Sequence, residues 1–88
     1  MTIELDGRQM RDRASLHDQL QDRLGLPAWY GRNLDALYDL LTERGEPLTI
    51  VLRFQEELKV QLGGYAGSFL DTLCQAAENN PALNVRFE

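Results

Sequence analysis

The sequence predicts a single α/β domain in which helices pack against a parallel sheet. Three short segments, at residues 2–6, 48–52 and 83–87, have the alternating or β-branched apolar composition of strands. Segments with helical periodicity separate them, and parallel strands need such crossover connections. A chain of 88 residues with 43% hydrophobic residues can also form one modest core without disulfides. We find no internal repeat or flexible linker, so residues 1–88 are expected to form one domain.

The N-terminal part predicts a strand followed by a helix. The strand is expected at Thr2–Asp6, where Ile3 and Leu5 share one side and an Asp6-Gly7 turn signal follows. Leucines then repeat every four residues along one face of a helix: Leu16, Leu20 and Leu24.

This first helix has start and stop signals. Ser15 followed by Asp18 resembles a capping box, and Gly25 is a stop signal. His17 lies at the edge of the leucine stripe. We expect it to be half-buried and hydrogen-bonded to a loop carbonyl rather than catalytic, because no nucleophile lies nearby in the sequence.

The segment at residues 27–42, PAWYGRNLDALYDLLT, has the composition of a functional site. Two aromatics, Trp29 and Tyr30, precede a turn at Gly31. Asn33 can cap the helix that follows. At 100° per residue, three leucines fall within about 60° of one another and predict the buried stripe of this helix: Leu34, Leu37 and Leu41.

The opposite side of this helix predicts an acidic, exposed face. Its residues are spaced i, i+3, i+4 and i+7: Asp35, Tyr38, Asp39 and Thr42. No basic residue lies between Leu34 and Glu43, so the two aspartates have no partner within the helix. A simpler interpretation is that Asp35 complements the helix N-terminus and Asp39 is an ordinary solvated carboxylate. Spacing alone leaves both interpretations open.

The C-terminal half predicts two more strands around helical segments. LTIVL at Leu48–Leu52 is typical of a strand covered on both sides. Gln55–Leu62 is compatible with a short helix or with irregular turns. A capping signal at Ser68 begins the last helix, unless that helix begins one turn earlier at Tyr65. Alternating apolar residues then predict an edge strand: Leu83, Val85 and Phe87.

Composition excludes several classes of protein. A net charge of -5 disfavours nucleic-acid binding and favours a basic partner or plain solubility. No apolar run approaches the ~20 residues that span a bilayer, and the N-terminus lacks the pattern of a signal peptide, so we expect a cytoplasmic protein with no membrane association. One cysteine, Cys74, and one histidine provide no metal cluster. We therefore expect neither a metal nor another cofactor.

Two catalytic interpretations are weak. The glycines of GGYAGS, residues 63–68, precede a helix, but the segment lacks the lysine and the spacing of phosphate-binding loops. Asp35 and Asp39 could form a general acid/base pair, as in glycosidases. Acid catalysis needs one desolvated carboxyl, however, and two carboxylates on an exposed helix face remain solvated. We therefore expect no enzymatic activity.

The whole chain resembles the barstar family of small, acidic, intracellular bacterial ribonuclease inhibitors. The most specific stretch is YGxNLDALxDxL at Tyr30–Leu41, and the opening strand, the Leu16-His17 helix and the LTIVL strand occur in the same order. This resemblance implies a three-stranded parallel sheet in order 1-2-3 with helices packed against it. It also implies that the loop and second helix plug the active-site cleft of a ribonuclease.

The resemblance also implies the site residues and the partner. Asp39 matches the carboxylate that takes the place of the scissile RNA phosphate, and Asp35 matches a neighbouring acidic contact. The partner is expected to be a basic extracellular-type or toxin ribonuclease, bound 1:1 by a protein that is monomeric when free. The expected partner-binding residues are Trp29, Tyr30, Gly31, Asn33, Asp35, Tyr38, Asp39, Thr42 and Gln75.

Some positions depart from the family pattern. Trp29 stands where tyrosine is typical, Tyr38 replaces a tryptophan, and Gln75 occupies an acidic position. Residues 43–45, Glu-Arg-Gly, change the rim of the site. These changes keep a second hypothesis open, in which the chain is a barstar-like binding or immunity module for a basic partner that is not a ribonuclease.

Overall fold

The computed structural model describes all 88 residues and contains the expected parallel sheet. Its strands are β1 (Thr2–Asp6), β2 (Leu48–Arg53) and β3 (Leu83–Phe87). They are hydrogen-bonded in the order β1-β2-β3, and the register places Leu5 beside Leu52 and Ile50 beside Val85. The predicted α/β class and strand order are therefore confirmed.

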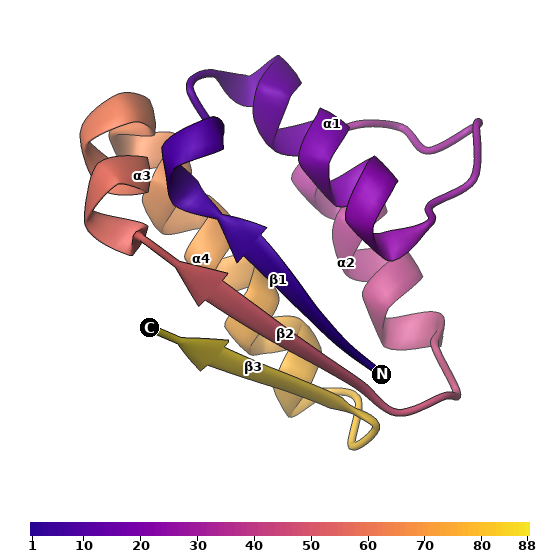
Figure 1. Cartoon of the computed structure of the whole chain (residues 1–88). Coiled ribbons are helices and arrows are strands. Elements are labelled where there is room, and N and C mark those ends of the chain that lie inside the picture. The colour runs from indigo at the N-terminus through magenta and orange to yellow at the C-terminus, as the bar shows by residue number, and fades with distance from the viewer.

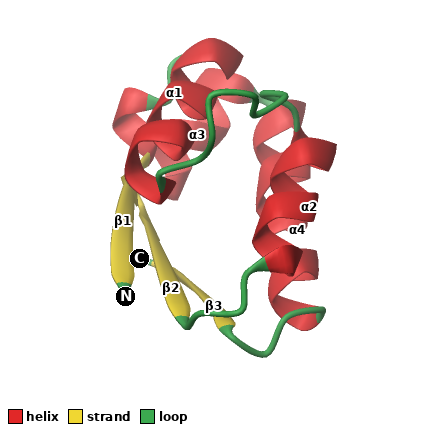
Figure 2. Ribbon diagram, turned by 90° about the vertical axis from the view of Figure 1, so that its right-hand side faces the viewer, coloured by secondary structure: helices red, strands yellow, loops and turns green.

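Helices connect the strands and cover one face of the sheet (Figures 1 and 2). They are the 3-10 helix η1 (Gly7–Gln9) and the α-helices α1 (Arg13–Leu24), α2 (Leu34–Glu43), α3 (Gln55–Leu62) and α4 (Gly64–Glu78). None of them combines the length and the apolar character needed to cross a membrane. The segment at 55–62, which the sequence left open, is helical.

The expectation that Leu48–Leu52 is covered on both sides is met only in part: Val51 is buried on the second side, but no helical layer covers it. Figure 2 shows helices on one side of the sheet and none on the other. On the helix-free side, Val51 is buried between its register neighbours Glu4 and Arg86, both of which are exposed. Neighbouring strands, rather than a second helical layer, account for the apolar residue at position 51.

Two helices begin earlier than the capping signals indicated. Asp12 caps α1, accepting a hydrogen bond from the Ser15 amide at 2.8 Å, while Ser15 Oγ accepts one from the Asp12 amide at 3.0 Å. Ser15 is therefore the last residue of the capping box, at position N3, rather than its first. In α4, which begins at Gly64, the carbonyl of Ser68 accepts a hydrogen bond from Thr72 inside the helix. Of the two predicted starts of this helix, Tyr65 is closer than Ser68 to the observed start at Gly64.

The core places α2 beside α4. A cluster of 17 buried apolar residues includes the predicted leucine stripe of α1 and, from α2, Leu37 and Leu41. Leu34 is partly buried against this cluster. Buried Asn80, just after α4, donates hydrogen bonds to the carbonyls of Leu41 and Arg44 at 2.9 Å each. The C-terminal ends of α2 and α4 are therefore tied together.

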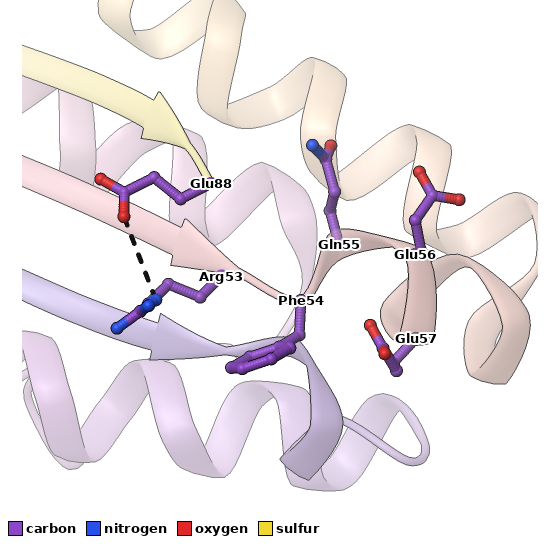
Figure 3. Close-up of a pocket in the computed structure, with 6 residues that line it drawn as sticks. All are labelled: Arg53, Phe54, Gln55, Glu56, Glu57 and Glu88. Carbon is purple, nitrogen blue, oxygen red and sulfur yellow. Dashed lines mark ion pairs between the residues drawn. The ribbon is translucent and has the colours of Figure 1, made fainter.

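A pocket lies at the carboxyl ends of the strands, at the junction of β2 and α3 (Figure 3). Its lining residues are Arg53, Phe54, Gln55, Glu56, Glu57 and Glu88. Such edges commonly bind ligands in α/β proteins. Here three carboxylates accompany the single guanidinium of Arg53, which is 4.0 Å from Glu88. The pocket contains none of the predicted site residues.

Candidate functional site: the loop at 25–33 and the exposed face of α2

The loop at residues 25–33 exposes one of its two aromatic side chains and buries the other. Gly25 ends α1 in the left-handed conformation, with φ of 62°. The Tyr30 amide and Gln21 Nε2 both donate to the Pro27 carbonyl, each at 3.0 Å. The Trp29 side chain is 76% exposed, whereas Tyr30 is only 4% exposed. Tyr30, although among the expected partner-binding residues, is therefore buried, and only Trp29 presents its ring to solvent.

Tyr30 is buried because its hydroxyl has a partner inside the protein. His17 Nδ1 lies 2.7 Å from the Tyr30 hydroxyl, and His17 Nε2 lies 2.7 Å from the Tyr65 hydroxyl. Neutral imidazole has one donor and one acceptor nitrogen, so one tyrosine donates and the other accepts. His17 thus links α1, the loop and α4, with two hydroxyls as partners instead of the predicted loop carbonyl.

Burial changes the acid-base properties of these groups. It lowers the pKa of His17, and the charges of Arg32 and Arg13 lower it further. Burial raises the pKa values of Tyr30 and Tyr65. The neutral forms of all three side chains are favoured, which fits a structural role in anchoring the loop.

The start of α2 is capped and closely packed. Asn33 caps the helix, accepting a hydrogen bond from the Ala36 amide at 2.8 Å, as predicted. Gly31 packs closely against this cap, since a Cβ there would lie 3.2 Å from Asn33 Nδ2 and 3.3 Å from the Ala36 Cβ. The polar face of α2 therefore begins at a fixed position.

Asp35 and Asp39 are exposed on α2, and neither takes part in an ion pair. Tyr38 is half-buried beside them, and its hydroxyl accepts a hydrogen bond from Asn79 Nδ2 at 2.9 Å. Thr42 donates to the Tyr38 carbonyl at 2.9 Å. Unlike Tyr38 and Thr42, the two carboxylates therefore have no hydrogen-bond or ion partner within the protein.

The exposed side of α4 extends the acidic character of α2. Gln75 is exposed, and Asp71 and Glu78 lie one turn before and one turn after it. Neither α2 nor α4 contains a lysine or arginine, and together they expose five carboxylates: Asp35, Asp39, Glu43, Asp71 and Glu78. Sequence reasoning missed the two on α4, although the absence of basic residues from 64–78 was a usable signal.

The arrangement suits binding better than catalysis or metal coordination. No group of three or more histidine, cysteine and acidic side chains is placed to hold a metal ion. Asp35 and Asp39 both face solvent, whereas a catalytic acid at neutral pH needs a dry environment. An exposed aromatic beside unpaired carboxylates can contact a cationic protein surface.

Two comparisons with known proteins show the family of the chain. The family described as "Barstar (barnase inhibitor)" matches the chain over residues 1–88. The "Putative ribonuclease inhibitor YrdF" of Bacillus subtilis (strain 168) is 46% identical over 77 residues, which are 86% of this chain and 85% of that protein. These matches confirm the resemblance carried by Tyr30–Leu41, and the chain belongs to the barstar family.

Proposed function

We propose that this protein inhibits a basic bacterial ribonuclease by covering its active site with the loop at 25–33 and the exposed face of α2. The observation that carries the proposal is the pair of exposed carboxylates, Asp35 and Asp39, which lack ion partners on a capped helix. Membership of the barstar family and the name of the Bacillus subtilis relative support this role.

In this mechanism a carboxylate takes the place of an RNA phosphate. Ribonucleases hold the scissile phosphate with cationic side chains, and a carboxylate on a rigid helix presents negative charge to them without reorganising. Asp39 lies near mid-helix and would enter the cleft, with Asp35 at its edge. Trp29, which is 76% exposed, would stack on a cationic or aromatic group of the enzyme.

Several expectations belong to this proposal. The inhibitor acts in the cytoplasm, needs no cofactor, performs no catalysis and binds its target 1:1. We assign the remaining predicted contacts to the same interface: Gly31, Asn33, Tyr38, Thr42 and Gln75. Tyr30 contributes indirectly, because its hydroxyl is hydrogen-bonded to His17 and so holds the loop in place.

A second candidate function is binding of a basic partner that is not a ribonuclease, including an immunity role. The neutral Gln75 favours it, because this exposed residue lies between Asp71 and Glu78 and lacks their charge. Arg44 also adds a half-buried cation at the end of α2. Both changes lie at the rim, where they would alter target choice while leaving Asp35 and Asp39 available.

The test is titration of RNA cleavage by barnase and other small basic bacterial ribonucleases with the purified protein. Inhibition that is complete at one equivalent supports the proposal, and binding without inhibition supports the second candidate. The control is the Asp35→Asn, Asp39→Asn double variant, which keeps side-chain shape and removes both charges. Equal inhibition by this variant would contradict the carboxylate mechanism.

A further inference from the structure

Arg32 is the only basic residue between Gly25 and Glu43, so it is the only cation of the loop and of α2. It lies three residues before Asp35. Arg32 precedes the N-cap Asn33 and so lies just outside α2, and its long side chain could turn toward the first turn of the helix, where it would neutralise a carboxylate that the proposed function needs.

In the structure, the Arg32 side chain is hydrogen-bonded to α1 and not to α2. Arg32 Nη2 donates to Asp18 Oδ1 at 2.6 Å and to the Ala14 carbonyl at 3.0 Å, and Nη1 donates to Gln21 Oε1 at 3.0 Å. All of these acceptors belong to α1. The backbone at Arg32 is left-handed, with φ of 56°, which non-glycine residues rarely adopt.

We propose that Asp18 is a positioning residue for the acidic face: it holds Arg32 on α1 and so keeps Asp35 and Asp39 free for a cationic partner. This inference rests on the proposed function. Asp18 itself lies outside the candidate contact residues and acts only through Arg32. Its carboxylate provides the charged acceptor, while Gln21 and the Ala14 carbonyl fix the geometry of the guanidinium.

The variant Asp18→Asn removes the charged acceptor, and Asp22→Asn is its matched control. Asp22 lies one turn further along α1, is exposed, and makes no ion pair or side-chain hydrogen bond. Both substitutions change the net charge from -5 to -4, because each removes one negative charge. Only Asp18→Asn removes the charged acceptor of Arg32 and leaves the guanidinium with neutral acceptors alone, so a difference between the two variants isolates the effect of this ion pair.

The first measurement uses the free protein and needs no partner. Trp29 is the only tryptophan and is exposed in the same loop, so its fluorescence reports the local charge. We expect Asp18→Asn to raise quenching by iodide relative to quenching by caesium by more than Asp22→Asn does, because only Asp18→Asn also leaves Arg32 without its ion partner. An unchanged ratio in Asp18→Asn would overturn the inference.

The second measurement is the association rate with barnase at low salt. We expect Asp18→Asn to slow association about threefold or more and Asp22→Asn to change it less than twofold, because steering depends on where the charge lies. In an Arg32→Gln background there is no cation to release. There, Asp18→Asn should have the small effect of Asp22→Asn, and an equal slowing in both backgrounds would overturn the inference.

Failure of the proposed function gives a different result. If the parent protein neither binds nor inhibits barnase or the other ribonucleases, the proposed function fails. The effect of Asp18→Asn on the quenching ratio of Trp29, compared in the parent and in the Arg32→Gln background, then still decides whether Asp18 acts through Arg32.

Discussion

Individual side chains on α2 divide between the core and solvent. Leu37 and Leu41 are buried, while Asp35 and Asp39 are exposed on the other side of the same two turns. Because no core contact depends on the aspartates, substitutions there separate binding from folding.

Asp39→Ala should weaken binding to the target ribonuclease more than any other single substitution. In the complex, its loss leaves cationic groups of the enzyme buried without a partner, which costs several kcal/mol. In the free protein, its loss should change stability by less than about 0.5 kcal/mol. The measurement is an alanine scan by calorimetry with parallel thermal melts. We expect smaller losses of affinity for Asp35→Ala and Trp29→Ala, and the smallest for Gln75→Ala. A loss of affinity in Asp39→Ala of less than about threefold, which is below 1 kcal/mol, would contradict the proposal.

His17 should make stability depend on pH. Burial lowers its pKa below the ordinary value of 6.5, so the unfolded state takes up a proton before the folded state does. The free energy of unfolding should therefore be flat above about pH 7 and fall as pH decreases below about 6.5, by at most ~1.4 kcal/mol per pH unit for one proton. Urea denaturation at a series of pH values measures this.

His17→Gln provides the control for that prediction. Glutamine can donate and accept hydrogen bonds but does not titrate, so its profile should be flat between about pH 5 and 7. The pKa values of Asp6 and Asp12 are lowered, chiefly by hydrogen bonds from Arg8 and Ser15 respectively. Their contribution is lost only below about pH 4. A slope between pH 5 and 7 that persists in His17→Gln would show that another group is responsible.

At the scale of elements, α2 is held by its leucine stripe. Leu37→Ala should cost about 2 to 5 kcal/mol of stability, through lost burial and the cavity left behind. Leu34→Ala, at a half-buried position, should cost less. Equilibrium denaturation measures both, and an unchanged melting temperature for Leu37→Ala would contradict the assigned orientation of the helix.

The connection between α2 and α4 makes a second prediction. Asn80→Ala removes the donors to the Leu41 and Arg44 carbonyls and the acceptor for the Ala82 amide. Leaving such groups unpaired should cost about 1 to 3 kcal/mol. The neighbouring Asn79→Ala loses only exposed side-chain hydrogen bonds, including that to the Tyr38 hydroxyl, and should cost about 1 kcal/mol or less. Similar losses in the two variants would show that the Asn80 side chain does not stabilise the connection between α2 and α4.

At the scale of the molecule, negative charge gathers on one pair of helices. Five of the fourteen acidic residues and none of the nine basic residues belong to α2 and α4. A field of one sign on one face steers a basic partner toward it. We expect the association rate with the target ribonuclease to fall by tenfold or more between low salt and about 0.5 M, where the Debye length is a few Å. Stopped-flow fluorescence of Trp29 can follow it, and a rate independent of salt would contradict steering.

The sequence by itself determined the order and type of the main elements, the leucine stripes and the acidic face of α2. These features depend on periodicity and caps within a few residues, which local composition reveals. The motif at Tyr30–Leu41 also identified the family. It could not show that η1 follows Asp6, because a turn signal does not distinguish a turn from a short 3-10 helix.

Only the tertiary structure decided which polar groups are satisfied internally. Tyr30 turns inward because His17 bridges it to Tyr65, which lies 48 residues beyond His17 in the chain. Arg32 pairs with Asp18, 14 residues before it, instead of with nearby Asp35. Hydrogen bonds between distant segments depend on how the helices pack, and no local period specifies that packing. The exposed charge of the site is therefore a property of the folded chain, set by which carboxylates the core and α1 leave unpaired.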